Sequence, residues 1–245
     1  MTVVKIILLA VAGIICLDLL FWILVIISSL FINPKKEYSK NSRYHRFLLN
    51  EATRRVVKVG RIKIHLTGIE KVPSDTRFLL VCNHRSKFDP ITTWYALKKF
   101  NIAFISKPEN FKVFSFGRII RKCCFLPIDR GNPHKAMKTI LDAIHLLEKN
   151  EVSIGIYPEG TRTTTGYMAE LKSGSFKIAE KAKVPVVIMT AKDTEKICRN
   201  FPFRKTDIYL DILDVIPKEK VIQMSTIEMS EYAEKLMKKN LGEIQ

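Results

Sequence analysis

The stretch FLLVCNHRSKFDP, residues 78–90, contains the most informative turn of this sequence. Its first five residues form an apolar run that is typical of a buried β-strand, and Asp89-Pro90 is a pair that commonly begins an α-helix. The stretch therefore predicts a strand, a short turn and a helix. Because α/β sheets carry their sites at the carboxyl ends of their strands, the polar residues of this turn are candidates for a functional site.

The same alternation of strands and helices continues on both sides of this stretch. Apolar runs of strand length lie at 62–66, 78–82, 102–106, 152–157, 184–190 and 208–215. Segments with helical periodicity lie at 90–99, 111–122, 134–149, 171–183 and 225–240. The pattern predicts an α/β fold with a mixed, mainly parallel sheet covered by helices, forming a single domain over residues 59–245.

The chain begins with an apolar segment that extends from Ile6 to Ile32. As a helix it would be roughly 40 Å long, compared with about 30 Å for the hydrocarbon core of a bilayer, so it can cross a membrane with tilt or lie partly in the interface. A cleavable signal peptide fits less well, because its apolar region has only about 7–15 residues and no small-x-small cleavage site precedes Asn33-Pro34. We therefore expect an N-terminal membrane helix.

One acidic residue, Asp18, lies near the middle of this apolar segment. A charged side chain at the centre of a bilayer costs roughly 2.5–3.5 kcal/mol even on the mildest scale. The favoured interpretation is that Asp18 is protonated, or reaches a nearby interface because the helix does not fully cross. A proton or substrate relay would need a partner charge, which the segment itself does not offer.

Positive charge is concentrated directly after the apolar segment. The chain has a net charge of +17, and residues 33–65 alone hold ten bases against Glu37 and Glu51. Basic residues next to a membrane helix favour the cytoplasmic side and attract anionic lipid headgroups. We expect the protein to bind the phospholipid bilayer with its α/β domain on the cytoplasmic face. Nucleic acid is not an expected partner, since zinc-finger spacing and an aromatic ribonucleoprotein signature are both missing.

Residues 44–59 have the pattern of a second, amphipathic helix. Apolar side chains recur at helical spacing from Tyr44 to Val59, with arginines around them. Such a helix can lie at a membrane surface or pack on the domain that follows, and the two interpretations are compatible. We assign residues 1–58 to membrane-anchoring helices.

Composition and motifs exclude several classes of protein. With 47% hydrophobic residues, the chain is too apolar to be disordered. The five cysteines show no C-x-x-C pair and no histidine at metal-ligand spacing, and the sequence has neither a glycine-rich nucleotide fingerprint nor a G-x-S-x-G elbow. The sequence therefore predicts reduced thiols, no metal and no bound cofactor.

His84 and Asp89 are the candidate catalytic residues. If the turn between them folds back, the Asp89 carboxylate can fix the tautomer of the imidazole and stabilise the imidazolium that forms when His84 takes a proton. Such a pair, without a serine or cysteine nucleophile, suits direct activation of a substrate hydroxyl. The alternative is structural, because an aspartate before a proline can simply start the helix.

A second polar segment, Tyr157-Pro158-Glu159-Gly160-Thr161-Arg162, also follows an apolar run. A turn that exposes backbone N–H groups, a hydroxyl and a guanidinium can bind a phosphate. Lys107 and Arg130 follow two further strand-like segments. On the residues alone, the segment could equally be a solvated turn and the two bases ordinary surface charges.

Four segments, taken together, resemble the motifs of the 1-acylglycerol-3-phosphate acyltransferase family of glycerolipid acyltransferases. The similar segments are Asn83-His84 to Asp89 for N-H-x-x-x-x-D, Phe125 to Arg130 for the second motif, Tyr157 to Arg162 for F-P-E-G-T-R, and Val184 to Val187 for the fourth. Ser106 to Glu109 and Lys172 to Gly174 also fall at the family's usual places. The chain departs from the family at Tyr157, where phenylalanine is usual, and at Ile188, where a second proline often stands.

The resemblance implies an enzyme that moves a fatty acyl group from acyl-CoA or acyl carrier protein to the free hydroxyl of lysophosphatidic acid, forming phosphatidic acid. It implies that His84 is the general base, oriented by Asp89. The acceptor phosphate would be bound by Lys107, Arg130, Glu159, Gly160, Thr161 and Arg162.

Other functions remain open at this point. An acyltransferase for glycerol-3-phosphate or another lysophospholipid, or a CoA-independent transacylase, would share the His-Asp pair. Outside the enzymes, the chain could be a catalytically silent, basic membrane-binding module. A silent relative would not need His84, Asp89, Glu159 and Arg162 all to be intact, so the sequence favours an enzyme.

Overall fold

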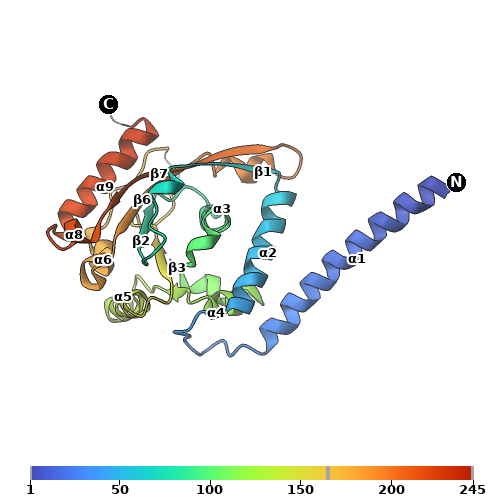
Figure 1. Cartoon of the computed structure of the whole chain (residues 1–245), viewed down its shortest axis with the longest axis horizontal. Coiled ribbons are helices and arrows are strands. Elements are labelled where there is room, and N and C mark those ends of the chain that lie inside the picture. Colours follow the sequence, from blue (N-terminus) through green and yellow to red (C-terminus); the bar gives the residue numbers. More distant parts are fainter. Residues whose placement is uncertain (1, 164–165, 244–245) are drawn as a thin grey trace.

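The computed structural model describes residues 2–163 and 166–243, and within them a seven-stranded sheet forms the centre of the molecule (Figure 1). The strands lie in the order β1-β7-β6-β2-β5-β3-β4. Their bounds are β1 Ile62–Thr67, β2 Leu79–Cys82, β3 Ile102–Ser106, β4 Leu126–Pro127, β5 Ser153–Ile156, β6 Val186–Lys192 and β7 Thr206–Ile216. The sheet is parallel from β6 to β4, while β7 runs antiparallel to β6 and parallel to β1. The prediction of a mixed, mainly parallel sheet is confirmed.

Helices cover both faces of this sheet. The helices are α1 Thr2–Leu30, α2 Arg43–Val59, α3 Asp89–Ala96, α4 Phe116–Lys122, α5 Pro133–Glu148, α6 Lys177–Ala182, α7 Lys196–Asn200, α8 Lys218–Val221 and α9 Thr226–Leu241. Short 3-10 segments are η1 Ile69–Lys71, η2 Lys98–Phe100, η3 Pro108–Lys112 and η4 Ser173–Phe176. Leu79 and Val81 of β2 pack toward α5, α6 and α9, whereas Leu80 and Cys82 pack toward α2, α3 and α4. This alternation explains why β2 is apolar throughout, because both of its faces are buried.

Two predicted helices differ from the observed ones, and one observed strand was not predicted. The helix predicted at 111–122 is interrupted at Ser115, whose φ of 59° is in the left-handed region, so that α4 begins only at Phe116. The helix predicted at 171–183 consists of η4 followed by the shorter α6. Strand β4 was not predicted, because two residues that include Pro127 are too few to show an alternating pattern.

Helix α2 packs on the body of the protein. Leu48 and Leu49 are buried, and the guanidinium of Arg46 donates to the carbonyl oxygens of Ile102 (3.1 Å) and Cys123 (3.3 Å). These contacts confirm the interpretation that the amphipathic helix packs on the domain that follows it. The assignment of residues 1–58 as an anchoring unit stays a prediction.

Helix α1 is long and apolar enough to cross a membrane, and it projects from the body (Figure 1). Within the described residues, its C-terminal half contacts the rest of the chain from Asp18 onward, and Val25 and Ser29 are buried there. Its N-terminal half exposes apolar side chains on every side. A helix that is apolar all round is stable in lipid rather than in water, so the structure agrees with membrane association.

The charge partner of Asp18 comes from α2. Arg55 Nε lies 2.7 Å from Asp18 Oδ1, and Trp22 Nε1 donates to the other carboxylate oxygen at 3.1 Å. The Arg55 guanidinium also lies 3.7 Å from the ring centre of Phe21. The apolar segment offers no partner charge of its own, as expected, but α2 supplies one. An ion pair therefore replaces the protonated or interface-seeking carboxylate as the simplest account of this residue.

Candidate active site

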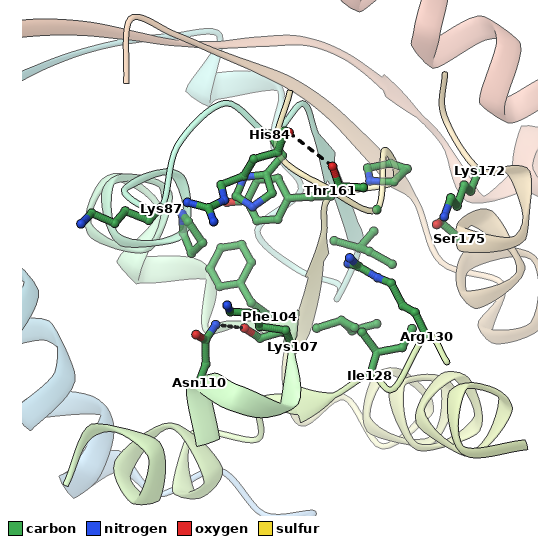
Figure 2. Close-up of a pocket in the computed structure, with 18 of the residues that line it drawn as sticks. His84, Lys87, Phe104, Lys107, Asn110, Ile128, Arg130, Thr161, Lys172 and Ser175 are labelled. Atoms are coloured by element: carbon green, nitrogen blue, oxygen red, sulfur yellow. Dashed lines mark hydrogen bonds between the residues drawn. The ribbon is translucent and has the colours of Figure 1, made fainter. Parts of the chain in front are cut away.

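The predicted site residues meet at one edge of the sheet, because β2, β3, β4 and β5 are parallel and their carboxyl ends lie together. His84 follows β2, Lys107 follows β3, Arg130 follows β4, and residues 157–162 follow β5. A cavity of about 840 Å³ opens at this edge. Figure 2 shows His84 and Thr161 on one side of it and Asn110, Lys107 and Ile128 on the opposite side.

Asp89 both starts α3 and contacts the imidazole. Its Oδ2 accepts hydrogen bonds from His84 Nδ1 and from the backbone N–H groups of Arg85 and Ser86, each at 2.7 Å. Its Oδ1 accepts from the hydroxyl of Thr194. The side chain is fully buried, and four donors around it match an ionised carboxylate, which only accepts. Asp89 is the first residue of α3, but the N-cap residue is Phe88 and no side chain of the described residues caps the helix, so the expected capping role of Asp89 is wrong.

The orientation of His84 leaves one ring nitrogen for chemistry. Because the Asp89 carboxylate accepts from Nδ1, that atom carries the proton and Nε2 is free to act as a base. Tyr157 stacks on the imidazole, with ring centres 4.4 Å apart and planes 25° apart. Among the described residues, none hydrogen-bonds to Nε2, and the ring lines the cavity. The pair is therefore arranged for proton abstraction from a molecule bound there.

Asn83 explains why the turn after β2 is fixed in place. Its side chain accepts from the Ala191 N–H at 2.7 Å and donates to the Ala191 carbonyl at 3.0 Å. The amide thus continues the hydrogen bonding between β2 and β6 by one residue. This buried contact holds the backbone from which His84 projects.

The turn after β5 requires a glycine. Gly160 has a φ of 79°, and a Cβ there would lie 2.9 Å from Lys172 Nζ. The turn carries Thr161 and Arg162, which are exposed to the cavity and line it. Gly160, Thr161 and Arg162 therefore all line the cavity, and their part in phosphate binding stays a prediction.

Glu159 does not lie in the cavity, although it was predicted to take part in phosphate binding. Its carboxylate is buried and accepts from the His84 backbone N–H at 2.5 Å, from the Ala169 N–H at 3.0 Å and from the Thr163 hydroxyl. A carboxylate facing a phosphate would also repel it. The geometry assigns Glu159 to holding the turns after β2 and β5 together.

The lining of the cavity is strongly basic. Besides Lys107, Arg130 and Arg162, three cations that were not predicted as binding residues line it: Arg85, Lys87 and Lys172. Burial lowers the pKa of the Arg130 guanidinium, which nevertheless remains charged at neutral pH. No acidic side chain occurs in the lining formed by the described residues. Figure 2 shows Lys87 at one end of the cavity and Lys172 and Ser175 at the other.

Another part of the lining is apolar. It is formed by Pro90, Phe104, Ile105, Ile128 and Ile156. Gly155 is needed here, because a Cβ would lie 2.5 Å from the ring of Phe104. The cavity therefore combines a base, a cluster of cations and an apolar wall, which suits an anionic molecule that carries a hydrocarbon chain.

The sequence contained some signal for the three cations that were not predicted. Lys172 belongs to a segment that resembles the family, and Arg85 and Lys87 lie in the turn after β2. Arg85 also donates to the Gly166 carbonyl at 2.8 Å. Thr194, which follows β6 and contacts Asp89, carried no signal, because a single threonine after a strand is unremarkable in sequence.

Comparison with known proteins agrees with the motifs. A family model described as "Acyltransferase" matches residues 63–192. The 1-acyl-sn-glycerol-3-phosphate acyltransferase of Bacillus subtilis is 33% identical over 128 residues, which cover 52% of this chain and 61% of that protein. The enzyme of the same name from Streptococcus pneumoniae is 34% identical over 127 residues, covering 51% of this chain and 46% of that protein. The chain thus matches about half to three fifths of these two relatives.

A solved structure extends the likeness to most of the fold. The crystal structure of the 1-acyl-sn-glycerophosphate acyltransferase from Thermotoga maritima matches with a TM-score of 0.65 over 90% of this chain and 86% of that one, at 23% identity. The family model covers more than half of the chain, including every predicted site residue. The chain belongs to the acyltransferase family.

Proposed function

We propose that the protein is a 1-acylglycerol-3-phosphate O-acyltransferase, which transfers a fatty acyl group to the free hydroxyl of lysophosphatidic acid and forms phosphatidic acid. The observation that carries the proposal is the His84–Asp89 pair at 2.7 Å, with Nε2 facing a cavity that has both cations and an apolar wall. The names of the relatives support the choice of acceptor.

In the proposed reaction, His84 Nε2 takes the proton of the acceptor hydroxyl. The oxygen attacks the thioester carbonyl carbon of acyl-CoA or acyl carrier protein, and the new C–O ester bond replaces the C–S bond. The imidazolium returns its proton to the leaving thiolate, so that His84 is regenerated. Asp89 stabilises the imidazolium between these two proton transfers. The step requires neither a metal nor a bound cofactor.

The acceptor phosphate is proposed to bind to Lys107, Arg130 and Arg162, with help from the Gly160-Thr161 turn. A guanidinium and a phosphate form short, charge-assisted hydrogen bonds, and a cavity without acidic lining favours a dianion. Lys172 Nζ lies beside Gly160 and adds a further positive charge to this part. The hydrocarbon chain would lie against the apolar wall.

Membrane attachment follows from the nature of the substrates. Lysophosphatidic acid and phosphatidic acid both reside in the bilayer, and α1 would hold the cavity at its surface. The basic segment 33–65 favours the cytoplasmic face. The proposed partners are therefore the phospholipid bilayer, lysophosphatidic acid and a cytoplasmic acyl donor.

The proposal is tested with the full-length protein in phospholipid vesicles, labelled acyl-CoA or acyl carrier protein, and a panel of acceptors. We expect a labelled diacyl product with lysophosphatidic acid and much less with lysophosphatidylcholine, which lacks a phosphomonoester. Preference for glycerol-3-phosphate or for another lysophospholipid would replace the proposed acceptor. Failure to acylate any acceptor with either donor would leave the membrane-binding module as the better account.

A further inference from the structure

Three exposed apolar side chains gather in the turn between η3 and α4. Val113, Phe114 and Phe116 are 51%, 63% and 41% exposed. The turn exists because Ser115 adopts a φ of 59° and the Phe116 N–H donates to the Phe114 carbonyl at 2.7 Å. A helix at this point, as the sequence predicted, would have rotated these side chains to different sides. The turn therefore presents them together.

The turn is attached to the last turn of α1. The Ser29 hydroxyl donates to Ser115 Oγ at 3.1 Å, and both side chains are buried. Arg118, three residues after Ser115, also contacts Ser29, because its Nη1 donates to the Ser29 carbonyl at 3.4 Å. The exposed side chains thus lie beside the point where the apolar helix joins the body.

Two further aromatic residues belong to the same region. Phe31, directly after α1, is 85% exposed, and the hydroxyl of the exposed Tyr44 lies 2.6 Å from Ser28 Oγ of α1. We call Phe31, Tyr44, Val113, Phe114 and Phe116 the basal aromatic patch. Tyrosine is enriched where a membrane protein meets the headgroup region, and phenylalanine is common on the apolar face of segments that lie in the interface.

Positive charge surrounds this patch. Lys112 adjoins it in sequence, the Arg118 guanidinium lies 6.0 Å from the ring centre of Phe114, and Lys35 and Lys36 follow Phe31. Apolar side chains ringed by bases fit the surface of an anionic bilayer, where the rings enter the interface and the bases meet the headgroups.

We propose that the turn Val113–Phe116 is a second membrane contact, which enters the headgroup region of an anionic phospholipid bilayer beside the base of α1. Continuity with α1 and complementary charge select a lipid surface as the occupant of the patch. The turn directly follows η3, whose neighbour Lys107 and member Asn110 line the cavity. Contact of this turn with the bilayer places that side of the cavity at the lipid surface, and this consequence rests on the proposed function.

The test uses three full-length proteins, each with one reactive exposed cysteine that carries an environment-sensitive fluorophore. The first keeps native Cys16 on α1 and carries Cys198→Ser; the second and third carry Cys16→Ser and Cys198→Ser with either Phe114→Cys or Ile227→Cys. Ile227 on α9 is 59% exposed, a fraction similar to that of Phe114. Helix α9 lies at the opposite end of the molecule from α1 (Figure 1). Ile227 is therefore the matched control.

On addition of phosphatidylglycerol-containing vesicles, the labels at 16 and 114 should shift to shorter wavelength and be quenched by brominated lipid acyl chains, whereas the label at 227 should not change. A label at 114 that behaves like the one at 227, while the label at 16 is quenched, would overturn the proposal. This readout requires no enzymatic activity, so it fails or succeeds independently of the proposed reaction.

A second measurement uses Phe114→Ser combined with Phe116→Ser. The double variant should lose about tenfold in rate on lysophosphatidic acid in vesicles, because the affinity of two rings for the interface is removed. Its rate on a short-chain, water-dispersed acceptor should equal that of the unmodified protein. Equal losses on both acceptors would show that the two rings support the fold rather than membrane contact.

Discussion

The turn after β2 and the turn after β5 each bury a carboxylate next to His84, yet the two carboxylates contact different parts of that residue. Asp89 accepts from the imidazole Nδ1, whereas Glu159 accepts from the backbone N–H. The remaining partners of Glu159 are Thr163 and Ala169, which belong to its own loop. Asp89 therefore acts on the tautomer and charge of the His84 imidazole. Glu159 acts on the position of the His84 backbone. The atom that each buried acid contacts therefore distinguishes the two carboxylates: the His84 ring for Asp89 and the His84 backbone for Glu159.

The largest effect on kcat is expected from removing the His84 imidazole. His84→Ala should lower kcat by about 10²–10⁴-fold, the usual contribution of a general base. The variant should bind vesicles as before, because α1 and the basal aromatic patch are unchanged. The rate with labelled acyl donor measures the loss, and retention of more than a tenth of the rate would remove His84 from the mechanism.

Asp89→Asn should give the next largest effect, a loss in kcat of about 10²-fold or more. The asparagine oxygen can still accept from the Arg85 and Ser86 N–H groups, and its NH₂ can donate to the Thr194 hydroxyl. The fold is therefore kept while the negative charge beside the imidazolium is lost. Circular dichroism and the rate at saturating substrates separate these effects.

Arg162→Ala tests what the turn after β5 contributes to binding. We expect about a tenfold rise in KM for lysophosphatidic acid, with KM for the acyl donor unchanged, since the proposed contact is with a phosphate that does not react. Arg199→Ala, which removes an arginine outside the cavity lining, serves as the control. A selective rise in the donor KM would instead place Arg162 on the phosphates of the donor.

Glu159→Gln should affect stability more than chemistry. A glutamine has only one acceptor oxygen to serve three donors, so at least one buried N–H or hydroxyl loses its partner, at a cost of about 1–3 kcal/mol. For a chain of this size, that corresponds to a fall in Tm of roughly 2–12 °C. The kcat at saturating acceptor should stay within about tenfold of the original. Thermal unfolding and steady-state kinetics provide the two numbers.

The smallest effect concerns Cys82, which lies directly before the turn after β2. Burial raises the pKa of its thiol well above the usual value, and the negative charges of Asp89 and Glu159 raise it further. A raised thiol pKa means that the protonated form dominates at neutral pH and that reactivity toward alkylating reagents is low. In the native protein, labelling followed by mass spectrometry should find Cys198 modified and Cys82 unmodified. Rapid labelling of Cys82 would show that the turn opens.

Much of the candidate active site could be predicted from the sequence, because His84, Lys107 and residues 157–162 each follow an apolar run that was recognised as a strand. The carboxyl ends of parallel strands share one edge, so these residues were expected to lie together once the strands were recognised. An apolar run followed by polar residues is a local pattern, so this part of the site can be predicted from the sequence. Arg130 follows β4, which was not predicted, so its place at the site depended on the family resemblance.

Three features could not be predicted in this way. The inward position of the Glu159 carboxylate depends on donors from the β2 turn, which are distant in sequence. The pairing of Asp18 with Arg55 depends on the packing of α1 against α2. The break at Ser115 depends on its contact with Ser29, 86 residues away. All three features depend on contacts between residues that are distant in sequence, and a local sequence pattern does not predict such contacts.

The most direct test of the account compares kcat and Tm for Asp89→Asn and Glu159→Gln in one set of vesicle assays at saturating lysophosphatidic acid and acyl donor. The account predicts that Asp89→Asn loses about 10²-fold or more in kcat with little change in Tm, and that Glu159→Gln loses several degrees in Tm with kcat within about tenfold. If Glu159→Gln abolishes kcat at unchanged Tm while Asp89→Asn remains active, the assignment of the two carboxylates is reversed and the proposed mechanism is wrong.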